Sequence, residues 1–414
     1  MRKRLRRNSI MIFLLGWTLF SSISISPAQE KVNLGDYPVF VDSLNVIENN
    51  EALLGFYSKL KQLEQGENKV VSILQIGDSH IQADFVSMYI RNQLQLQFGN
   101  AGRGLIFPLK LAKTNEPLDF RIKSNVEWQN KKIKDRKDPM KKGLAGAYIT
   151  TREDSFYLDL DVINKTLIDY CFRKATMVYE KGKNAHGFDI ADTSGRFVGF
   201  FDPLVGDDQI SVFESDTETM ALRFIACSDD TLATTTFYGF ILENGESGIL
   251  YHSVGINGAE YYDYLLAPGV LKQQALLKPD LIIVSLGTND AYRKTFDEEE
   301  FCGRFDRMLT VVRETFPDVP VLLSTPGDYY RRRKYKNPAT RELSWLVAEY
   351  AKEKSYPYWD FYNIMGGYGS INKWFRYGLI QKDKLHCTRR GYEVQGELFF
   401  NALMNGYRNA EELF

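Results

Sequence analysis

The chain has 414 residues, of which 44% are hydrophobic and 14% aromatic. This apolar content is enough to bury a full core and excludes an intrinsically disordered protein. Its 52 basic and 53 acidic residues give a formal net charge of -1, which argues against a dedicated nucleic-acid surface and leaves uncharged partners open.

The first residues differ in character from the rest of the chain. A cluster of arginines and lysines precedes an apolar run from Ile10 to Phe20, and small residues at Ser26 and Ala28 suit cleavage after Ala28. The apolar run is shorter than the ~20 residues that a membrane span needs. We therefore predict a signal peptide over residues 1–28, a periplasmic or secreted protein, and no stable membrane span after cleavage. An uncleaved signal anchor is the alternative.

The next segment predicts a strand, a sharp turn and a helix. Val70 to Ile76 is a β-rich apolar run that ends at Gly77, as in a buried strand. Apolar residues then recur every four positions between Val86 and Phe98, and Gly99 follows as a helix stop. Residues 31–104 thus form the first part of an α/β domain.

Residues 105–250 lack this alternation of strands and helices. They contain short segments rich in Thr, Phe, Tyr and Val, such as Leu232 to Leu242, between Gly, Asp and Asn turns. We interpret this region as an inserted β-rich domain resembling a sandwich. Its charged run from Lys131 to Lys142 is expected to be a solvated loop rather than a ligand-binding patch.

Residues 251–414 return to alternating strands and helices. The strands and helix positions that we predict are Leu281–Leu286, Phe301–Val312, Val319–Ser324, Thr340–Glu353, Tyr356–Phe361 and Val394–Ala402. This order is typical of a mainly parallel sheet that is covered on both faces.

The four cysteines lie far apart and show no metal-binding spacing: Cys171, Cys227, Cys302 and Cys387. We therefore expect no metal site. A disulfide between Cys171 and Cys227 is conceivable in an exported protein, and free buried thiols are the alternative.

The first candidate for chemistry is Ser79, in the segment Gly77-Asp78-Ser79-His80. It lies where a strand's carboxyl end turns into a helix, which is the edge where ligands bind in open parallel sheets. Free backbone N–H groups at that point can hold a developing oxyanion. The structural alternative is a serine that caps the helix.

A nucleophilic serine needs a base, and four histidines are available: His80, His186, His252 and His386. His80 leaves the same turn as Ser79 and is expected to shape the pocket wall. We expect His186 to be a surface residue and His252 to be structural. Asp383 precedes His386 by three residues, so its carboxylate can accept the imidazole N–H and fix the tautomer. An ordinary loop ion pair is the alternative.

Two further segments offer hydrogen-bond donors for an oxyanion. Asn289 follows the strand that ends at Gly287, at the same sheet edge as Ser79, and its side chain carries an amide NH₂ group. Gly255 can offer a backbone N–H that no side chain obstructs. Both residues could instead serve only as turn residues.

These residues occur in the order that names the SGNH (GDSL-like) hydrolases, which the chain resembles: Gly77-Asp78-Ser79, Gly255, Asn289 and Asp383-x-x-His386. The resemblance implies a flavodoxin-like three-layer α/β fold and a serine esterase. It also implies that Ser79 is the nucleophile, that His386 is the base and that Asp383 orients His386. The oxyanion hole would consist of the Ser79 N–H, Gly255 and Asn289.

A narrower resemblance is to periplasmic peptidoglycan O-acetylesterases, which carry a β-sandwich between the nucleophile segment and the glycine segment. The segments that carry it are Gly99–Gly104, Gly255–Ala259, Gly287–Asn289, Asn363–Gly367, Trp374 and Lys382–His386. Two features depart from that pattern, namely Cys387 in place of an aromatic residue and the long basic loop. Carbohydrate binding by the inserted domain is an implied role.

The resemblance implies removal of O-acetyl groups from an acetylated cell-envelope glycan, specifically the C6 O-acetyl of peptidoglycan muramic acid, without a metal or organic cofactor. Three alternatives stay open: an acetylesterase acting on plant or dietary polysaccharide, an O-acetyltransferase with the same triad, and a non-catalytic glycan-binding protein. The complete set of candidate catalytic residues argues against the last alternative.

Overall fold

The computed structural model describes residues 31–164, 167–207, 209–228, 232–293 and 295–411. The predicted signal peptide over residues 1–28 lies outside this described part. Within it, we find no helix with the length and apolar character that crossing a membrane requires.

A six-stranded sheet forms the centre of an α/β domain. Its strand order is β1-β19-β16-β15-β2-β14, and only β1 runs antiparallel to its neighbour. The strands are β1 (Ile47–Glu48), β2 (Val70–Gly77), β14 (Gly248–Gly255), β15 (Leu281–Ser285), β16 (Val321–Ser324) and β19 (Tyr358–Trp359). Every residue of β2 after Val70 is buried, as expected for a parallel strand that is covered on both faces.

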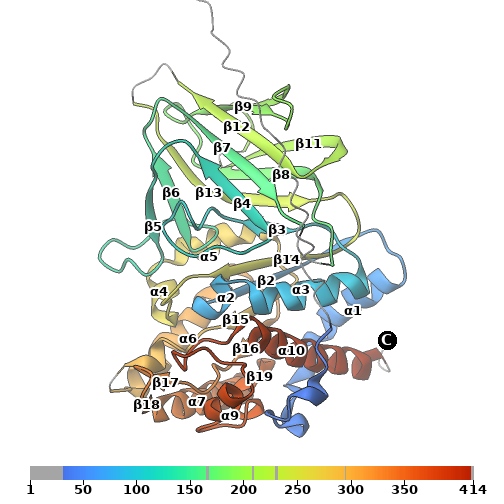
Figure 1. The fold of residues 1–414 in the computed structure, drawn as a ribbon, viewed down its shortest axis with the longest axis vertical. Coiled ribbons are helices and arrows are strands. Elements are labelled where there is room, and N and C mark those ends of the chain that lie inside the picture. The colour runs from blue at the N-terminus through green and yellow to red at the C-terminus, as the bar shows by residue number, and fades with distance from the viewer. Residues whose placement is uncertain (1–30, 165–166, 208, 229–231, 294, 412–414) are drawn as a thin grey trace, which may run out of the picture.

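Helices cover both faces of this sheet, which gives the domain three layers (Figure 1). On one face, Ile73 packs in a core with Leu94 and Leu398. On the other face, Val284 packs in a core with Leu309. The helices of the first face are α1 (Leu54–Glu64), α3 (Phe85–Phe98) and α10 (Arg389–Glu411), and those of the second are α4 (Tyr261–Leu266), α5 (Pro268–Gln274), α6 (Glu298–Thr315) and α7 (Pro338–Lys354). The predicted three-layer α/β fold is confirmed.

The predicted helix after β2 is divided into two. The short helix α2 (Ser79–Gln82) ends before Asp84, which has a left-handed backbone with φ 59°, and α3 begins at Phe85. A non-glycine residue rarely adopts this conformation without support from its surroundings. Asp84 receives that support from buried arginines, described below, which sequence periodicity does not reveal.

The inserted domain is a sandwich of two antiparallel sheets, which lies above the α/β domain in Figure 1. One sheet has the order β10-β9-β12-β7-β4 and the other β11-β8-β13-β6-β5, with β3 paired to β13. The bounds are β3 (Gly104–Ile106), β4 (Phe120–Ser124), β5 (Gln129–Lys132), β6 (Ala147–Thr151), β7 (Ser155–Val162), β8 (Phe172–Tyr179), β9 (Gly187–Ala191), β10 (Phe197–Phe201), β11 (Ile210–Thr219), β12 (Ala221–Cys227) and β13 (Thr235–Glu243). Alternate residues of β7 are buried, as in a strand with one face in a sandwich core.

The strand that returns from the sandwich to the parallel sheet begins earlier than the sequence suggested. β14 starts at Gly248 and pairs with β2 from Val70 onward, whereas the predicted domain boundary fell between residues 250 and 251. The difference arises because β13 and β14 are both apolar and are separated only by a short turn.

The charged run 131–142 begins with the last two residues of β5 and continues as a largely exposed loop, as predicted. Arg136 donates from Nε to Asp263 Oδ1 at 2.6 Å and forms a second ion pair with Glu260 at 2.9 Å. Its guanidinium also lies 5.3 Å from the ring centre of Tyr262. Most side chains of the loop are exposed, and the contacts of Arg136 attach the loop to α4.

The suggested disulfide between Cys171 and Cys227 is absent, because Cys171 carries a free thiol. Cys302 and Cys387 are free as well. Burial raises the pKa of the Cys387 thiol to about 12, so this thiol stays protonated and unreactive near neutral pH.

Candidate active site

The turn that carries Ser79 is shaped by the residues on either side of it. A side chain at Gly77 would overlap Ile81, so the close return of the chain requires glycine there. Asp78 caps α2, because its carboxylate accepts the His80 N–H at 2.9 Å. Ser79 is therefore not the helix cap, and its hydroxyl is directed toward His386.

Ser79, His386 and Asp383 form a continuous chain of hydrogen bonds. Ser79 Oγ lies 3.0 Å from His386 Nε2, and His386 Nδ1 lies 2.7 Å from Asp383 Oδ2. The second carboxylate oxygen of Asp383 accepts the backbone N–H groups of Leu385 at 3.0 Å and His386 at 3.1 Å. Partial burial opposes the charge on Asp383, but the hydrogen bonds from His386 and Leu385 hold the pKa of this carboxyl below its usual value. Asp383 is thus an ionised acceptor at neutral pH.

The turn between Asp383 and His386 is held in place by Lys384. Lys384 adopts a left-handed backbone with φ 53°, which lets the chain reverse within this short spacing. Its carbonyl accepts the Tyr330 N–H at 2.8 Å, and its ammonium lies 3.1 Å from Asn372 Oδ1 and 4.8 Å from the Tyr330 ring centre. These contacts fix the direction in which His386 points.

Asn289 lies at the same edge of the sheet, just after β15. Its Nδ2 is 3.1 Å from the carbonyl of Ala259 and 3.3 Å from Asp78 Oδ2. The contact with Asp78 places the amide beside the residue that precedes Ser79. The structure therefore brings together the three triad candidates and Asn289, which come from three separate segments of the sequence.

Gly255 is the last residue of β14 and lies directly opposite Gly77 of β2. A side chain at Gly255 would overlap the backbone of Gln82, so glycine is needed here for α2 to pack on the strand. Its role as an oxyanion donor stays a prediction. Gly258 lies in the same turn with φ 80° and offers a second glycine N–H that the sequence analysis did not consider.

His80 packs beside the proposed base, as expected of a pocket-wall residue. Its ring centre lies 5.2 Å from that of His386, and its Nδ1 is 3.0 Å from the hydroxyl of Tyr392. Burial lowers the pKa of His80, and proximity to His386 acts in the same direction. The imidazole of His80 is therefore neutral beside His386.

The other two histidines are structural, and one expectation about them is wrong. His186 was expected on the surface, but it is fully buried in the sandwich, with Nδ1 2.9 Å from Thr235 Oγ1. His252 is also fully buried, and its Nδ1 accepts the Leu105 N–H at 3.0 Å. Burial, with Arg103 nearby, lowers the pKa of His252 to about 3.

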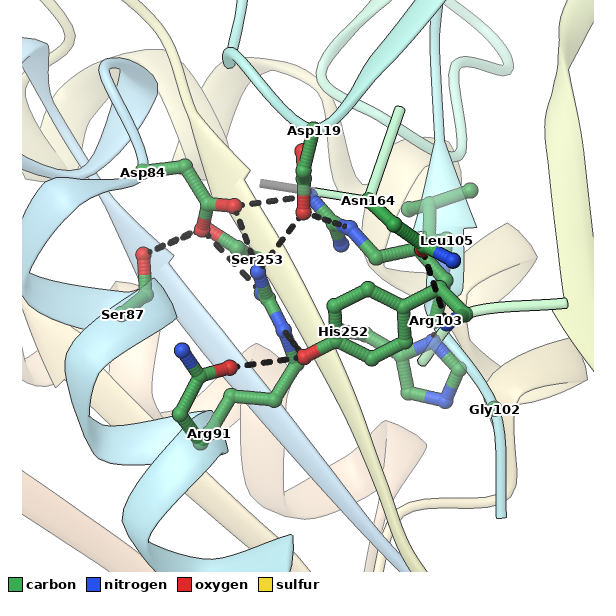
Figure 2. A network of polar contacts seen from close by, with 12 residues as sticks. Asp84, Ser87, Arg91, Gly102, Arg103, Leu105, Asp119, Asn164, His252 and Ser253 are labelled. Carbon is green, nitrogen blue, oxygen red and sulfur yellow. Dashed lines mark hydrogen bonds and ion pairs between the residues drawn. The ribbon is translucent and has the colours of Figure 1, made fainter. Parts of the chain in front are cut away.

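A buried network of four charged residues, shown in Figure 2, adjoins the turn over residues 77–80 that carries Ser79, which we call the serine turn. The sequence did not indicate this network. Asp84 Oδ2 lies 2.9 Å from Arg91 Nη2 and 2.7 Å from Arg103 Nη2, and Asp119 forms ion pairs with the same two arginines. All four side chains are at most 3% exposed. Burial disfavours the charge of Asp84, but Arg91 and Arg103 hold its pKa below the usual value. Because Asp84 joins α2 to α3 and Asp119 precedes the sandwich strand β4, the network ties the serine turn to the inserted domain.

Gln82 makes a second connection from α2 to the inserted domain. Its Nε2 lies 2.9 Å from Thr114 Oγ1 and 2.7 Å from Asn115 Oδ1, and its Oε1 accepts the Asn257 N–H at 2.7 Å. Asn257 Nδ2 in turn lies 2.8 Å from Asn115 Oδ1. The sandwich side of the site is therefore built from polar groups of both domains.

Comparison with known proteins agrees with this arrangement. Residues 235–394 match the model of the GDSL-like Lipase/Acylhydrolase family, a range that contains Gly255, Asn289, Asp383 and His386. In fold, in the matched segment and in the geometry of the site, the chain is thus similar to the SGNH (GDSL-like) hydrolases, a class of carboxylic ester hydrolases.

Among solved structures, the chain is similar to a peptidoglycan O-acetylesterase, with a TM-score of 0.71 and 20% sequence identity over 86% of this chain and 96% of that chain. Shorter matches include a GDSL-like lipase from Bacteroides thetaiotaomicron (TM-score 0.28, 20% identity, 37% of this chain and 76% of that chain). Another is a carbohydrate esterase family 3 protein from Talaromyces cellulolyticus (TM-score 0.30, 16% identity, 40% and 73%). No curated protein matches the chain significantly.

Proposed function

We propose that the protein is an exported serine esterase that removes O-acetyl groups from cell-envelope glycan, with the C6 O-acetyl of peptidoglycan muramic acid as its substrate. The observation that carries the proposal is the hydrogen-bonded chain from Ser79 through His386 to Asp383. This order of hydroxyl, imidazole and carboxylate is the arrangement that activates a serine for acyl transfer.

In the first step, Ser79 Oγ attacks the acetyl carbonyl while His386 Nε2 takes the hydroxyl proton. Asp383 stabilises the imidazolium that forms, through the hydrogen bond to Nδ1. His386 then gives the proton to the departing sugar oxygen, which leaves an acetyl group on Ser79. In the second step, water attacks this acetyl-enzyme with His386 again as base, and acetate is released.

The tetrahedral oxyanion needs hydrogen-bond donors, each of which typically contributes about a hundredfold to a thousandfold to the rate. We assign this task to the backbone N–H of Ser79, the side-chain amide of Asn289 and the backbone N–H of Gly255. Gly255 begins the turn over residues 255–259, which we call the glycine turn. The two amide hydrogens of Asn289 are directed to Asp78 at 3.3 Å and to Ala259 at 3.1 Å, so the amide must exchange one of these contacts, the longer one with Asp78, for the oxyanion.

Support for the acetyl-glycan substrate comes from the whole architecture. The likeness to a peptidoglycan O-acetylesterase covers 86% of the chain, a range too long for the α/β domain alone, so it takes in sandwich residues as well. The inserted region also supplies Thr114 and Asn115 beside Gln82 of the serine turn, which supports a role for this region in contacting a polymer whose ester is at Ser79.

The test is acetate release from O-acetylated peptidoglycan, with acetylated xylan in parallel, by the purified protein and its Ser79→Ala variant. We expect release from peptidoglycan that the variant abolishes. Release from xylan alone would keep the chemistry and change the substrate. Transfer of acetyl to a sugar acceptor in excess of hydrolysis would identify a transferase, and no reaction with any ester would contradict the proposal.

A further inference from the structure

The docked loop 131–142 brings a lysine to the glycine turn of the active site. Lys134 Nζ lies 3.3 Å from the carbonyl of Asn257. It is also 3.1 Å from the position that a side-chain carbon on Gly258 would occupy. Asn257 is itself bonded to Gln82 of α2, so the ammonium of Lys134 stands beside the turn that borders Ser79.

Lys134 and its neighbour Lys132 lack the carboxylate partners that several cations around them have. Three cations of the loop are paired with carboxylates: Lys131 with Asp138, Arg136 with Asp263, and Lys142 with Glu180. Within the described part of the chain, Lys132 and Lys134 form no ion pair. The same holds for Lys137 and Lys141, but Lys134 is the lysine whose ammonium contacts Asn257. Burial lowers the pKa of Lys132, and the nearby charge of Lys134 lowers it further. Two adjacent ammonium groups without a carboxylate are a place where an anion would relieve repulsion.

The loop holds these two lysines in a defined position. Ile133, which lies between them, is buried, and its N–H donates to the Gly146 carbonyl at 2.9 Å. Gly146 packs so closely on Ile256 of the glycine turn that a side-chain carbon there would lie 2.8 Å from it. Because the backbone is anchored on both sides, ordering the lysines on a ligand costs less entropy than it would on a free loop.

We propose that Lys132 and Lys134 form a subsite for a carboxylate on the glycan whose acetyl ester is held at Ser79. This inference rests on the proposed esterase function and narrows its substrate to an acidic glycan. The ammonium groups would form charge-assisted hydrogen bonds with the carboxylate, whereas a neutral polymer such as acetylated xylan would leave them unpaired. The subsite thus favours a substrate with acid groups close to the acetylated sugar.

The subsite can be tested with sugars that differ only in an acid group. Hydrolysis of p-nitrophenyl acetate is measured with N-acetylmuramic acid or N-acetylglucosamine as inhibitor, and separately with glucuronate or glucose. The inhibition constant for each sugar is determined in the full-length protein, in Lys134→Gln and Lys132→Gln, and in Lys134→Arg. We expect an acid to inhibit at least about tenfold more strongly than its neutral partner, because a charge-assisted bond adds roughly this factor. We expect this preference to be lost in the two Gln variants and largely kept in Lys134→Arg.

The matched control is Lys137→Gln, since Lys137 is exposed in the same loop and has no place in the site. It should keep both the rate and the preference for acids. Selective inhibition by glucuronate alone would support the subsite while contradicting peptidoglycan as the substrate. Equal inhibition by acidic and neutral sugars, or a preference that survives in Lys134→Gln and Lys132→Gln, would overturn the inference.

Discussion

The serine turn is supported from two sides by interactions of opposite character. On one side lie Asp383 and His386, whose side chains are 28% and 30% exposed and which contact each other within a single short turn. On the other side stands the network of Asp84, Arg91, Arg103 and Asp119, which is at most 3% exposed and joins two domains. The first set is open to water and the second is closed to it.

This difference follows from what each side does. In the proposed mechanism, His386 exchanges protons with the serine, the leaving group and water, so complete burial would hinder it. The four buried charged residues take no part in proton transfer in the proposed mechanism. Each is neutralised by two partners, which offsets the large cost of removing charges from water. We infer that the exposed side supplies the chemistry and that the buried side holds the serine turn against the sandwich.

We expect the largest effect from Asp383→Asn, which tests whether the exposed side supplies the chemistry. The variant keeps the size of the side chain but no longer fixes the tautomer or stabilises the imidazolium of His386. We expect kcat to fall on the order of 10³- to 10⁴-fold, with little change in the free energy of unfolding. Steady-state kinetics on p-nitrophenyl acetate and urea unfolding would measure the two quantities. A variant that is destabilised but nearly fully active would reverse the roles that we assign.

On the buried side, we expect Arg91→Met to change mainly the stability of the protein. The substitution leaves Asp84 and Asp119 short of positive charge in a site without water, so we expect the free energy of unfolding to fall by about 3–5 kcal/mol. Arg223→Met is the matched control, because Arg223 forms a two-fold ion pair with Asp159 on the exposed sandwich surface. Its loss should be about 1 kcal/mol or less. Equal losses in the two variants would show that burial does not set the strength of the network.

A dependence of stability on pH is expected from His252, which lies beside the network (Figure 2). The pKa of His252 is lowered from 6.5 to about 3 by burial and by Arg103 and Arg91. Between these values the unfolded chain binds a proton that the folded chain does not, so stability falls as the pH falls. This residue should contribute up to about 1.4 kcal/mol per pH unit. Urea unfolding from pH 6 to pH 4 should show a shallower pH dependence in His252→Gln, and an unchanged slope would contradict the assignment.

We expect the smallest effect, a change in kcat/KM, from substitution of His80 on the exposed side. The neutral imidazole of His80 is engaged by Tyr392 rather than by a carboxylate, so it is not equipped to act as the base. We expect His80→Gln to lower kcat/KM by less than about tenfold, whereas His386→Gln should lower it on the order of 10⁴-fold or more. Comparable losses in the two variants would mean that the neighbouring histidines share the proton transfer.

The exposed side of the site could be predicted from the sequence because its signals are local. Asp383 and His386 are three residues apart, and Ser79 and Asn289 each follow an apolar strand whose end is marked by glycine. The carboxyl ends of parallel strands meet at one sheet edge, so the pattern of strands was enough to expect that these residues would lie together. The three-layer fold followed from the same alternation.

The buried side could not be predicted because its signals are spread over separate segments. Nothing near Arg103 or Asp119 in the sequence indicates a partner, and charged residues are ordinarily placed on the surface. For the same reason, His186 was expected to be exposed, and the contacts of Arg136 with α4 were not foreseen. In each case a tertiary contact buries or docks a residue type that is usually in water.

The most direct test of the central claim is to label the nucleophile. The protein is incubated with diethyl p-nitrophenyl phosphate, which phosphorylates activated serines, and its proteolytic peptides are analysed by mass spectrometry. We predict a single diethylphosphoryl adduct on Ser79, absent in Ser79→Ala and strongly reduced in His386→Ala. An adduct on a different residue, or hydrolysis of p-nitrophenyl acetate that persists at full rate without any adduct, would contradict the account.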